Sequence, residues 1–188
     1  MSQRSRPGEA RARVIGAALA VFARHGVAAA SLQMIADELG VTKAAIYHQF
    51  QTKDDIVRAV VAPALARLAE VTELAERRRG RSARAEIVLA GIVDLVIEHR
   101  ELTALLQSDR SLIGLLQEGL ELQALEQRVF RLLSGPDPTP ETHVAVVMAS
   151  GALMSAATGH HLAHLDDAAL RQHLLSNVRR LLRLRTPS

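Results

Sequence analysis

The stretch SLQMIADELGVTKAAIYHQFQTKDDIV, residues 31–57, contains two short helical patterns separated by a glycine. Its first apolar residues fall at helical spacing: Leu32, Ile35, Ala36 and Leu39. Ser31 is a suitable N-cap for this helix, and Gly40 supplies the sharp turn after it. Thr42 is placed to cap a second short helix directly after the turn. The stretch therefore predicts two short helices joined by a tight turn.

The flanking residues extend this pattern on both sides. Residues 9–25 form an apolar stripe at helical spacing, and Gly26 is the expected C-terminal cap of that helix. After the short helices, Thr52 with two aspartates behind it starts a further helix, because carboxylates are favoured at a helix N-terminus. Pro63 falls inside that segment and is expected to bend or break it.

The remaining residues also read as helices. The expected ranges are 53–77, 82–99, 101–108, 111–133, 139–160 and 166–184. Residues 134–141, SGPDPTPE, make the clearest break, with Thr139 as the cap and Pro140 at the first helical position. A second break falls at ERRRGRS, residues 76–82, whose arginines are most simply those of a solvated loop. The chain is predicted to be all-α, with short helices first and longer helices after them.

Composition narrows the class of protein. The chain has 188 residues, 48% of them hydrophobic, which is enough for a core, and no cysteine. Disulfides, thiolate metal sites and cysteine nucleophiles are therefore excluded. No apolar run approaches the roughly 20 residues needed to cross a bilayer, and residues 1–13 lack the apolar core of a signal peptide. We expect a cytoplasmic protein with no membrane partner.

The positive charge is concentrated at the N-terminal end. Residues 1–60 hold eight Lys and Arg against five Asp and Glu, whereas the rest of the chain is balanced. Phosphates are contacted by Lys and Arg through Coulomb attraction and counterion release, so a segregated basic end favours a module that binds a polyanion. The alternative is a solvated basic tail without a specific partner.

Residues 31–57 resemble the DNA-binding signature of TetR-family transcriptional regulators. The resemblance rests on the capped helix, the glycine turn and the run Y-H-x-F-x-x-K at residues 47–53. It covers about the first 60 residues, and the remainder agrees with the family only in length and helix number. It implies an N-terminal three-helix helix-turn-helix DNA-binding domain at residues 1–52 and a larger helical ligand-binding and dimerisation domain at 53–188.

The helix-turn-helix arrangement assigns roles to the exposed side chains. The second short helix of such a unit enters the major groove, so small or polar groups are needed at its start. Ala44 allows close approach, Tyr47 and His48 can donate to phosphates, and Lys53 with the next helix's N–H groups offers a second phosphate site. Ile46 and Phe50 are expected to pack inside. The candidate DNA contacts are Ser31, Gln33, Thr42, Lys43, Ala44, Tyr47, His48 and Lys53.

Three of these assignments have plainer alternatives. Tyr47 can instead cover the core of the small domain, because it is a half-polar aromatic on a short helix. His48 can be an ordinary solvated residue, and Ser31 can do no more than cap its helix.

Reading two half-sites on duplex DNA requires two copies of the DNA-binding domain at a fixed separation. The helix-turn-helix therefore implies a dimer. Residues 145–159 are rich in Ala, Ser and Gly, which permits close approach of helices. Residues 168–184 carry an apolar stripe: Leu170, Leu174, Leu175, Val178, Leu181 and Leu182. We expect a homodimer through residues 139–184, the alternative being that both helices complete the core of one chain.

The resemblance also implies a small-molecule effector bound by the long helices. Phe130 is the only aromatic residue after Phe50, so a cavity there would be walled by aliphatic side chains. Such walls suit a largely aliphatic ligand and argue against flat cationic dyes or quaternary ammonium ions. The candidate ligand-binding residues are His99, Leu106, Gln107, Arg110, Leu116, Gln117, Gln123 and Phe130.

These implications define a ligand-responsive dimeric transcriptional regulator, a repressor released from a palindromic DNA operator by its effector. The alternative is a ligand-independent DNA-binding regulator or architectural protein. His160, His161 and His164, with Asp166 nearby, suggest a metal site, but nothing fixes a third ligand and a solvated helix end is the better interpretation. We expect no metal, no cofactor and no enzymatic activity, since no catalytic motif occurs in the sequence.

Overall fold

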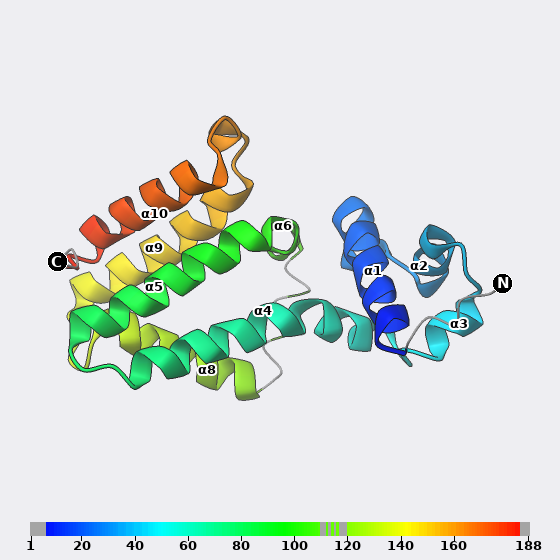
Figure 1. Cartoon of the computed structure of the whole chain (residues 1–188), viewed down its shortest axis with the longest axis horizontal. Coiled ribbons are helices and arrows are strands. Elements are labelled where there is room, and N and C mark those ends of the chain that lie inside the picture. Colours follow the sequence, from blue (N-terminus) through cyan, green and yellow to red (C-terminus); the bar gives the residue numbers. More distant parts are fainter. Residues whose placement is uncertain (1–6, 110–111, 113, 115, 117–119, 185–188) are drawn as a thin grey trace. The chain divides into compact units, whose positions relative to one another are not determined.

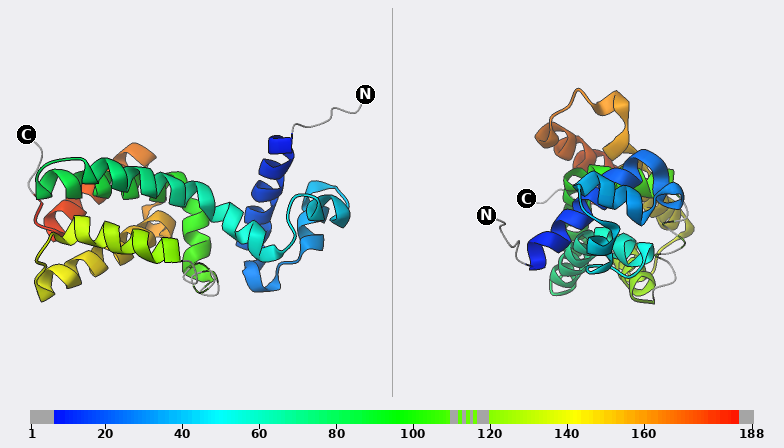
Figure 2. Two further views of the ribbon diagram at one scale, coloured as in Figure 1. Left: turned by 90° about the horizontal axis from the view of Figure 1, so that it is seen from below. Right: turned by 90° about the vertical axis from the view of Figure 1, so that its right-hand side faces the viewer.

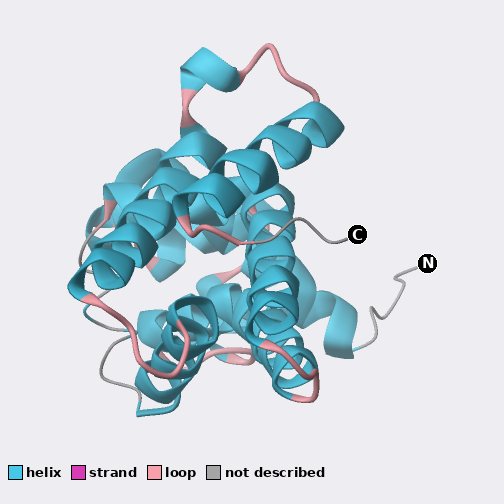
Figure 3. Cartoon of the chain, turned by 90° about the vertical axis from the view of Figure 1, so that its left-hand side faces the viewer, coloured by secondary structure: helices cyan, strands magenta, loops and turns pink. Residues whose placement is uncertain are grey.

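A computed structural model describes residues 7–109, 112, 114, 116 and 120–184 of the chain (Figure 1). Within these residues it contains helices and loops but no strand, which confirms the all-α prediction (Figure 3). The helices are α1 (Pro7–Ala29), α2 (Leu32–Leu39), α3 (Lys43–Tyr47), α4 (Lys53–Glu76), α5 (Arg81–Glu98), α6 (Arg100–Ser108), α8 (Leu120–Ser134), α9 (Pro140–Thr158) and α10 (Asp167–Leu181). A 3₁₀ turn, His160–Leu162, lies between the last two helices.

The chain forms two compact units, and neither is continuous in sequence. Unit 1 comprises Met1–Pro63 and Leu105–Glu118, and unit 2 comprises Ala64–Ala104 and Gly119–Ser188. The sequence placed the boundary between residues 52 and 53. The units divide instead inside α4, because its first turns carry buried apolar side chains that belong to the core of unit 1: Ile56, Val57, Val60 and Val61.

Helix α1 is longer than expected and is interrupted near its end. Gly26 has φ 74° and ψ 157°, which is not helical, and the helical turn that follows it reaches Ala29. An L side chain rarely adopts this backbone conformation, so glycine is required at this break. Gly26, predicted as the C-terminal cap, does interrupt the helix where the apolar stripe ends, but a further helical turn follows it to Ala29, so the predicted end at residue 25 is too early.

Helix α1 also corrects an expectation about membranes. By length and composition the segment Gly8–Ala29 is apolar enough to cross a bilayer, although the sequence predicted no such segment. Several of its apolar side chains are buried inside unit 1: Val14, Ala17, Ala18, Val21 and Phe22. A core helix of a folded domain satisfies the same criteria, and the burial of this stripe favours that interpretation.

Helix α4 starts with a reciprocal cap. The Thr52 hydroxyl accepts from the backbone N–H of Asp55 at 3.1 Å, and the Asp55 carboxylate accepts from the N–H of Thr52 at 3.0 Å. The hydrogen bonds from Thr52 lower the pKa of the Asp55 carboxyl. Pro63 does not break the helix, which is continuous from Lys53 to Glu76. Proline has no N–H to donate, so the helix lacks one backbone hydrogen bond at the boundary between the units.

Unit 2 is built around α5. This helix packs against α8, α9 and α10, and Figures 1 and 2 show α5, α9 and α10 running alongside one another. Their buried residues form one cluster, which includes Val88, Leu89 and Val93 of α5. Gly91 lets α4 approach closely, because a Cβ at that position would lie 2.4 Å from Cγ1 of Val71.

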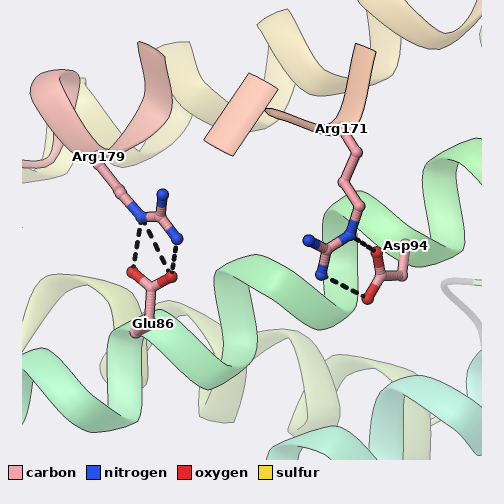
Figure 4. A network of polar contacts seen from close by, with 4 residues as sticks. All are labelled: Glu86, Asp94, Arg171 and Arg179. Carbon is pink, nitrogen blue, oxygen red and sulfur yellow. Dashed lines mark hydrogen bonds and ion pairs between the residues drawn. The ribbon is translucent and has the colours of Figure 1, made fainter. Parts of the chain in front are cut away.

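Two ion pairs join α5 to α10 (Figure 4). Arg171 donates to the Asp94 carboxylate from Nε at 2.6 Å and from Nη2 at 3.2 Å. Arg179 donates from Nε to both carboxylate oxygens of Glu86, at 3.1 and 3.0 Å, and it also donates from Nη2. Forked pairs of this kind fix orientation as well as distance, so they set the register between the two helices.

Candidate nucleic-acid interface

Helices α2 and α3 form a helix-turn-helix whose ends are closed by the predicted residues. The Ser31 hydroxyl accepts from the Met34 N–H at 3.2 Å, and the Thr42 hydroxyl accepts from the Ala45 N–H at 3.3 Å. Gly40 adopts a left-handed conformation with φ 64° and donates its N–H back to the last turn of α2. These contacts confirm the two predicted N-caps, Ser31 and Thr42, and the predicted turn at Gly40, and together they determine where α3 begins.

Helix α3 presents the predicted polar face to solvent. Thr42, Lys43, Ala44, Tyr47 and His48 are all exposed, and Tyr47 keeps 49% of its surface accessible. The Lys43 ammonium lies 5.7 Å from the centre of the Tyr47 ring, within the range of a cation–π contact. The exposure of Tyr47 argues against the alternative in which it only covers the core.

The opposite face of the α3 segment is buried. Ile46 is fully buried and Phe50 is 3% exposed, as the sequence predicted. Arg11 of α1 covers Phe50, with its guanidinium carbon 4.1 Å from the ring centre, and it donates to the Gln49 carbonyl at 3.0 Å. This role of Arg11 was not predicted from the sequence, because the residues that Arg11 contacts lie 38 or more positions away. Phe50 was nevertheless a signal, since a buried aromatic ring near a basic helix can hold an arginine.

The two candidates at the start of α2 are exposed but already engaged. Ser31 uses its oxygen as the helix cap, and the Gln33 amide donates to the Asp37 carboxylate at 2.8 Å. Neither contact removes the side chain from solvent, so both residues remain predicted phosphate contacts.

Lys53 lies differently from the phosphate site that the sequence suggested. Its ammonium donates to the carbonyls of Val27 at 2.7 Å, Ala28 at 3.2 Å and Ala30 at 3.1 Å. An ammonium has three donors, so these carbonyls use its full capacity. We therefore assign Lys53 a structural role: it ties the start of α4 to residues 27–30, the last turn of α1 and the residue after it, which together are called the α1–α2 connection below.

A second side chain, that of Asp109, binds the same connection, but as an acceptor instead of a donor. The Asp109 carboxylate accepts from the Val27 N–H at 2.7 Å, in a part-buried position. The carboxylate also lies 3.6 Å from where a Cβ would stand on Gly26. The α1–α2 connection is thus bound through its carbonyls by Lys53 and through an amide by Asp109. No local pattern indicates this role of Asp109, because it lies 82 residues from Val27 in the chain.

The candidate ligand-binding residues are divided between the two units. His99, Gln123 and Phe130 lie in unit 2, whereas Leu106, Gln107 and Leu116 lie in the segment that belongs to unit 1. His99, Leu106, Leu116 and Phe130 are half-buried, and Gln107 and Gln123 are exposed. The Phe130 ring packs on His143, with centroids 5.1 Å apart. Arg110 and Gln117 lie outside the described residues. The assignment of these residues stays a prediction.

Unit 2 contains an apolar cavity of about 110 Å³, and its described lining residues do not include those candidates. They come from α5, α8, α9 and α10, among them Ile92, Leu133, Leu153, Met154 and Val178. The walls are largely aliphatic, as predicted for the ligand site. Helix α8 carries Gln123 and Phe130 and also lines the cavity, but the other lining helices, α5, α9 and α10, carry none of the predicted residues.

The histidines at the end of α9 do not share a helical face. Helix α9 ends at Thr158, His160 and His161 lie in the 3₁₀ turn, and His164 lies beyond that turn. Among the described residues no group of three His, Asp or Glu side chains is placed to hold a metal ion. The spacing argument for a metal site therefore does not apply here.

Comparison with known proteins agrees with the local geometry. Residues 14–60 match the family described as bacterial regulatory proteins, tetR family. A 54-residue stretch is 46% identical to the HTH-type transcriptional regulator SrpR of Pseudomonas putida, covering 29% of this chain and 25% of that protein. The chain therefore spans only a quarter of the length of this curated relative.

Solved structures extend the similarity to the whole fold. A TetR-like transcriptional regulator from Rhodococcus sp. RHA1 superposes with a TM-score of 0.66 at 19% identity, covering 98% of this chain and all of that one. FadR of Bacillus subtilis, solved in complex with stearoyl-CoA, has a TM-score of 0.62 at 18% identity, over 89% of this chain and 96% of that one.

The structural role of Lys53 is testable through stability. Replacing Lys53 by Met keeps the apolar stem but leaves three carbonyls without their donor, so the free energy of unfolding should fall by about 2 kcal/mol. Lys43→Met is the matched control, because Lys43 is exposed and bonds to no backbone carbonyl in the described structure. Urea unfolding of the full chain measures both. Equal stability of the two variants would contradict the assignment.

Proposed function

Because residues 14–60 match the tetR family of bacterial regulatory proteins and the whole fold resembles that of TetR-like regulators, we propose that this chain is a TetR-family transcriptional regulator that binds duplex DNA. The observation that carries the proposal is the capped α3 helix, which turns Thr42, Lys43 and Tyr47 to solvent while Ile46 anchors it from behind. A helix of this kind fits the major groove with its N-terminal residues at base edges.

Each exposed position has a distinct task in this proposal. Ala44 is small enough for the helix to approach the bases, and its methyl group can rest on a thymine methyl. Lys43, Tyr47 and His48 reach phosphates, which fix the register of the helix without reading sequence. Thr42 both caps α3 and lies at the entrance of the groove. Its hydroxyl oxygen accepts from the Ala45 N–H, and its hydroxyl proton can be donated to the DNA.

Salt dependence tests the phosphate contact of Lys43. With a duplex selected from random sequence by the wild-type protein, Lys43→Ala should flatten the slope of log affinity against log salt by about 0.9 for each bound copy of α3. Ala44→Leu is the uncharged control: it obstructs the base edges, so it should weaken binding of the selected duplex while leaving the slope unchanged. An unaltered slope for Lys43→Ala, measured by fluorescence anisotropy, would remove Lys43 from the phosphate contacts.

We infer that the protein acts as a homodimer and that α9 provides the main contact. Val144, Val147 and Met148 project from α9 with 58%, 66% and 56% of their surfaces exposed. Such a row of large apolar side chains is unusual on a single chain's surface and typical of an interface. A groove of about 390 Å³ beside it, between α9 and the end of α10, can receive side chains of a second copy.

Helix α10 contributes less to this interface than its sequence suggested. Of its predicted apolar stripe, Leu170, Leu175, Val178 and Leu182 are buried within unit 2. Leu174 and Leu181 are half-buried against the same core. The stripe on α10 thus supports the alternative of core packing, and the proposed interface narrows to the outer face of α9 and the groove that it forms with the end of α10.

A charge placed in this face tests the dimer. Val147→Glu would bury a carboxylate against a second apolar surface, so sedimentation should shift the protein from two chains to one. Leu74→Glu is the control, because Leu74 is similarly exposed, at 51%, but belongs to α4 and not to α9. A wild-type protein that sediments as one chain would rule out the dimer altogether.

We further propose that a largely aliphatic small molecule releases the protein from its operator. The aliphatic cavity of unit 2 supports an apolar ligand, and FadR of B. subtilis holds a ligand with a stearoyl chain. The cavity is smaller than the roughly 150 Å³ site that holds benzene in an engineered protein, so an effector must widen it. Widening would displace α5 and the helices packed on it, which gives the ligand a structural effect to transmit.

Helix α4 is a covalent route for that effect, since it begins in unit 1 and ends in unit 2. A saturated fatty acid that binds should weaken operator binding by about 5- to 150-fold. Restoring the missing backbone hydrogen bond with Pro63→Ala should change this factor, because the helix becomes stiffer at the unit boundary. Operator titration with and without the acid measures both proteins. Binding of the acid without any loss of operator affinity would favour the alternative, a ligand-independent or architectural DNA-binding protein.

The proposal implies a cytoplasmic protein, because its operator is in the bacterial chromosome. It requires no cofactor and no enzymatic step.

A further inference from the structure

Four arginines of unit 2 converge on one pocket, although the sequence analysis above interprets one of them, Arg81, as part of a solvated loop. Arg81 and Arg84 come from the first turn of α5, and Arg128 and Arg131 come from α8. They line a pocket of about 470 Å³ together with Glu76. None of the DNA-binding, dimer or effector assignments uses this pocket.

The pocket carries an excess of positive charge. Glu76 is the one acidic side chain among its lining residues, and Arg128 already binds it with two hydrogen bonds of 2.9 and 2.7 Å. These bonds, with the charges of Arg131 and Arg84, lower the pKa of the Glu76 carboxyl. Four guanidinium groups against one carboxylate leave about three positive charges to be balanced by solvent or by a ligand.

Protein contacts hold several of these arginines in place. Arg84 donates from Nε to the Arg78 carbonyl at 2.7 Å. Arg81 lies against Gly135, where a Cβ would stand only 2.8 Å from Nε of the arginine. Gly135 also has φ +88°, which L side chains rarely adopt. The glycine therefore makes room for the guanidinium, and the pocket is pre-formed on this side.

Two guanidinium groups are left for a ligand. Neither Arg81 nor Arg131 forms an ion pair with another described side chain. The N-terminus of α5 adds to them, because its N-cap is Gly80, which lines the pocket and has no side chain to satisfy the first N–H groups. Such N–H groups favour an anion at the same place as the arginines.

We propose that this pocket binds the phosphate groups of a small phosphorylated molecule. Guanidinium groups pair with phosphate oxygens through two parallel hydrogen bonds. One phosphate group brings about −1.5 to −2 charges at pH 7, so a diphosphate matches the excess of the pocket better than a monocarboxylate does. The proposal does not depend on DNA binding, because every residue in it belongs to unit 2.

Calorimetry with inorganic pyrophosphate tests the site in the full-length protein. Arg81→Gln combined with Arg131→Gln should weaken pyrophosphate binding at least tenfold. The control combines Arg13→Gln with Arg67→Gln, two exposed arginines of α1 and α4 that do not line the pocket. It removes the same net charge, so its affinity should stay within twofold of the wild type.

A third variant separates geometry from charge. Gly135→Ala keeps all four arginines but displaces Arg81, so it should also weaken pyrophosphate binding, with circular dichroism verifying that the helices remain folded. Absence of pyrophosphate binding to the wild type, or equal loss in the two double variants, would overturn the proposal. Citrate binding as tight as pyrophosphate would overturn the assignment to phosphate, and displacement of pyrophosphate by random duplex DNA alone would indicate a nucleic-acid patch instead.

Discussion

The ammonium of Lys53 is the contact on which the geometry of unit 1 depends. By binding the carbonyls of Val27, Ala28 and Ala30, it joins the start of α4 to the α1–α2 connection, which sets the direction of α2. Asp109 binds the amide of Val27 in the same connection. Because α2 and the Gly40 turn then determine where α3 lies, the charge-assisted contacts of two part-buried side chains hold the exposed face of α3 from a distance.

The interior of unit 2 follows a different logic. Its helices are packed through aliphatic side chains, which fill space but do not define a register. Arg171 and Arg179 add that register by pairing with carboxylates on α5. The result is a body in which α10 is fixed to α5 and α9 keeps an apolar side free, so that the same unit can have a rigid core and an unfilled surface.

Local chemistry explains which features could be read from the sequence. Ser31, Gly40, Thr42 and Thr52 act on residues within four positions of themselves, so their roles are visible in a short window. The burial of Ile46 and Phe50 follows from helical spacing in the same way. These signals predicted the helix-turn-helix and most helix boundaries.

Long-range contacts explain what the sequence did not reveal. The carbonyls bound by Lys53 lie 23 to 26 residues away, and nothing in its own neighbourhood distinguishes it from an exposed lysine. Helices α9 and α10 both pack against α5, and only the fold shows that the stripe of α10 is buried while Val144, Val147 and Met148 of α9 stay exposed. The arginine pocket is of the same kind, because Arg81 and Arg131 are 50 positions apart and meet only through the fold.

The interrupted sequence of unit 1 limits how this protein can exchange parts with its relatives. Recombination within α4 would join the N-terminal part of a foreign unit 1 to the rest of this chain. The chain would then keep its own Leu105–Glu118, the segment that completes unit 1. The foreign N-terminal part would then face an Asp109 selected for a different partner, and the original N-terminal part would lose the acceptor of its Val27 amide. The two parts of unit 1 are therefore expected to diverge together. The segment after α6 should change in step with the α1–α2 connection, not with the helices beside it in sequence.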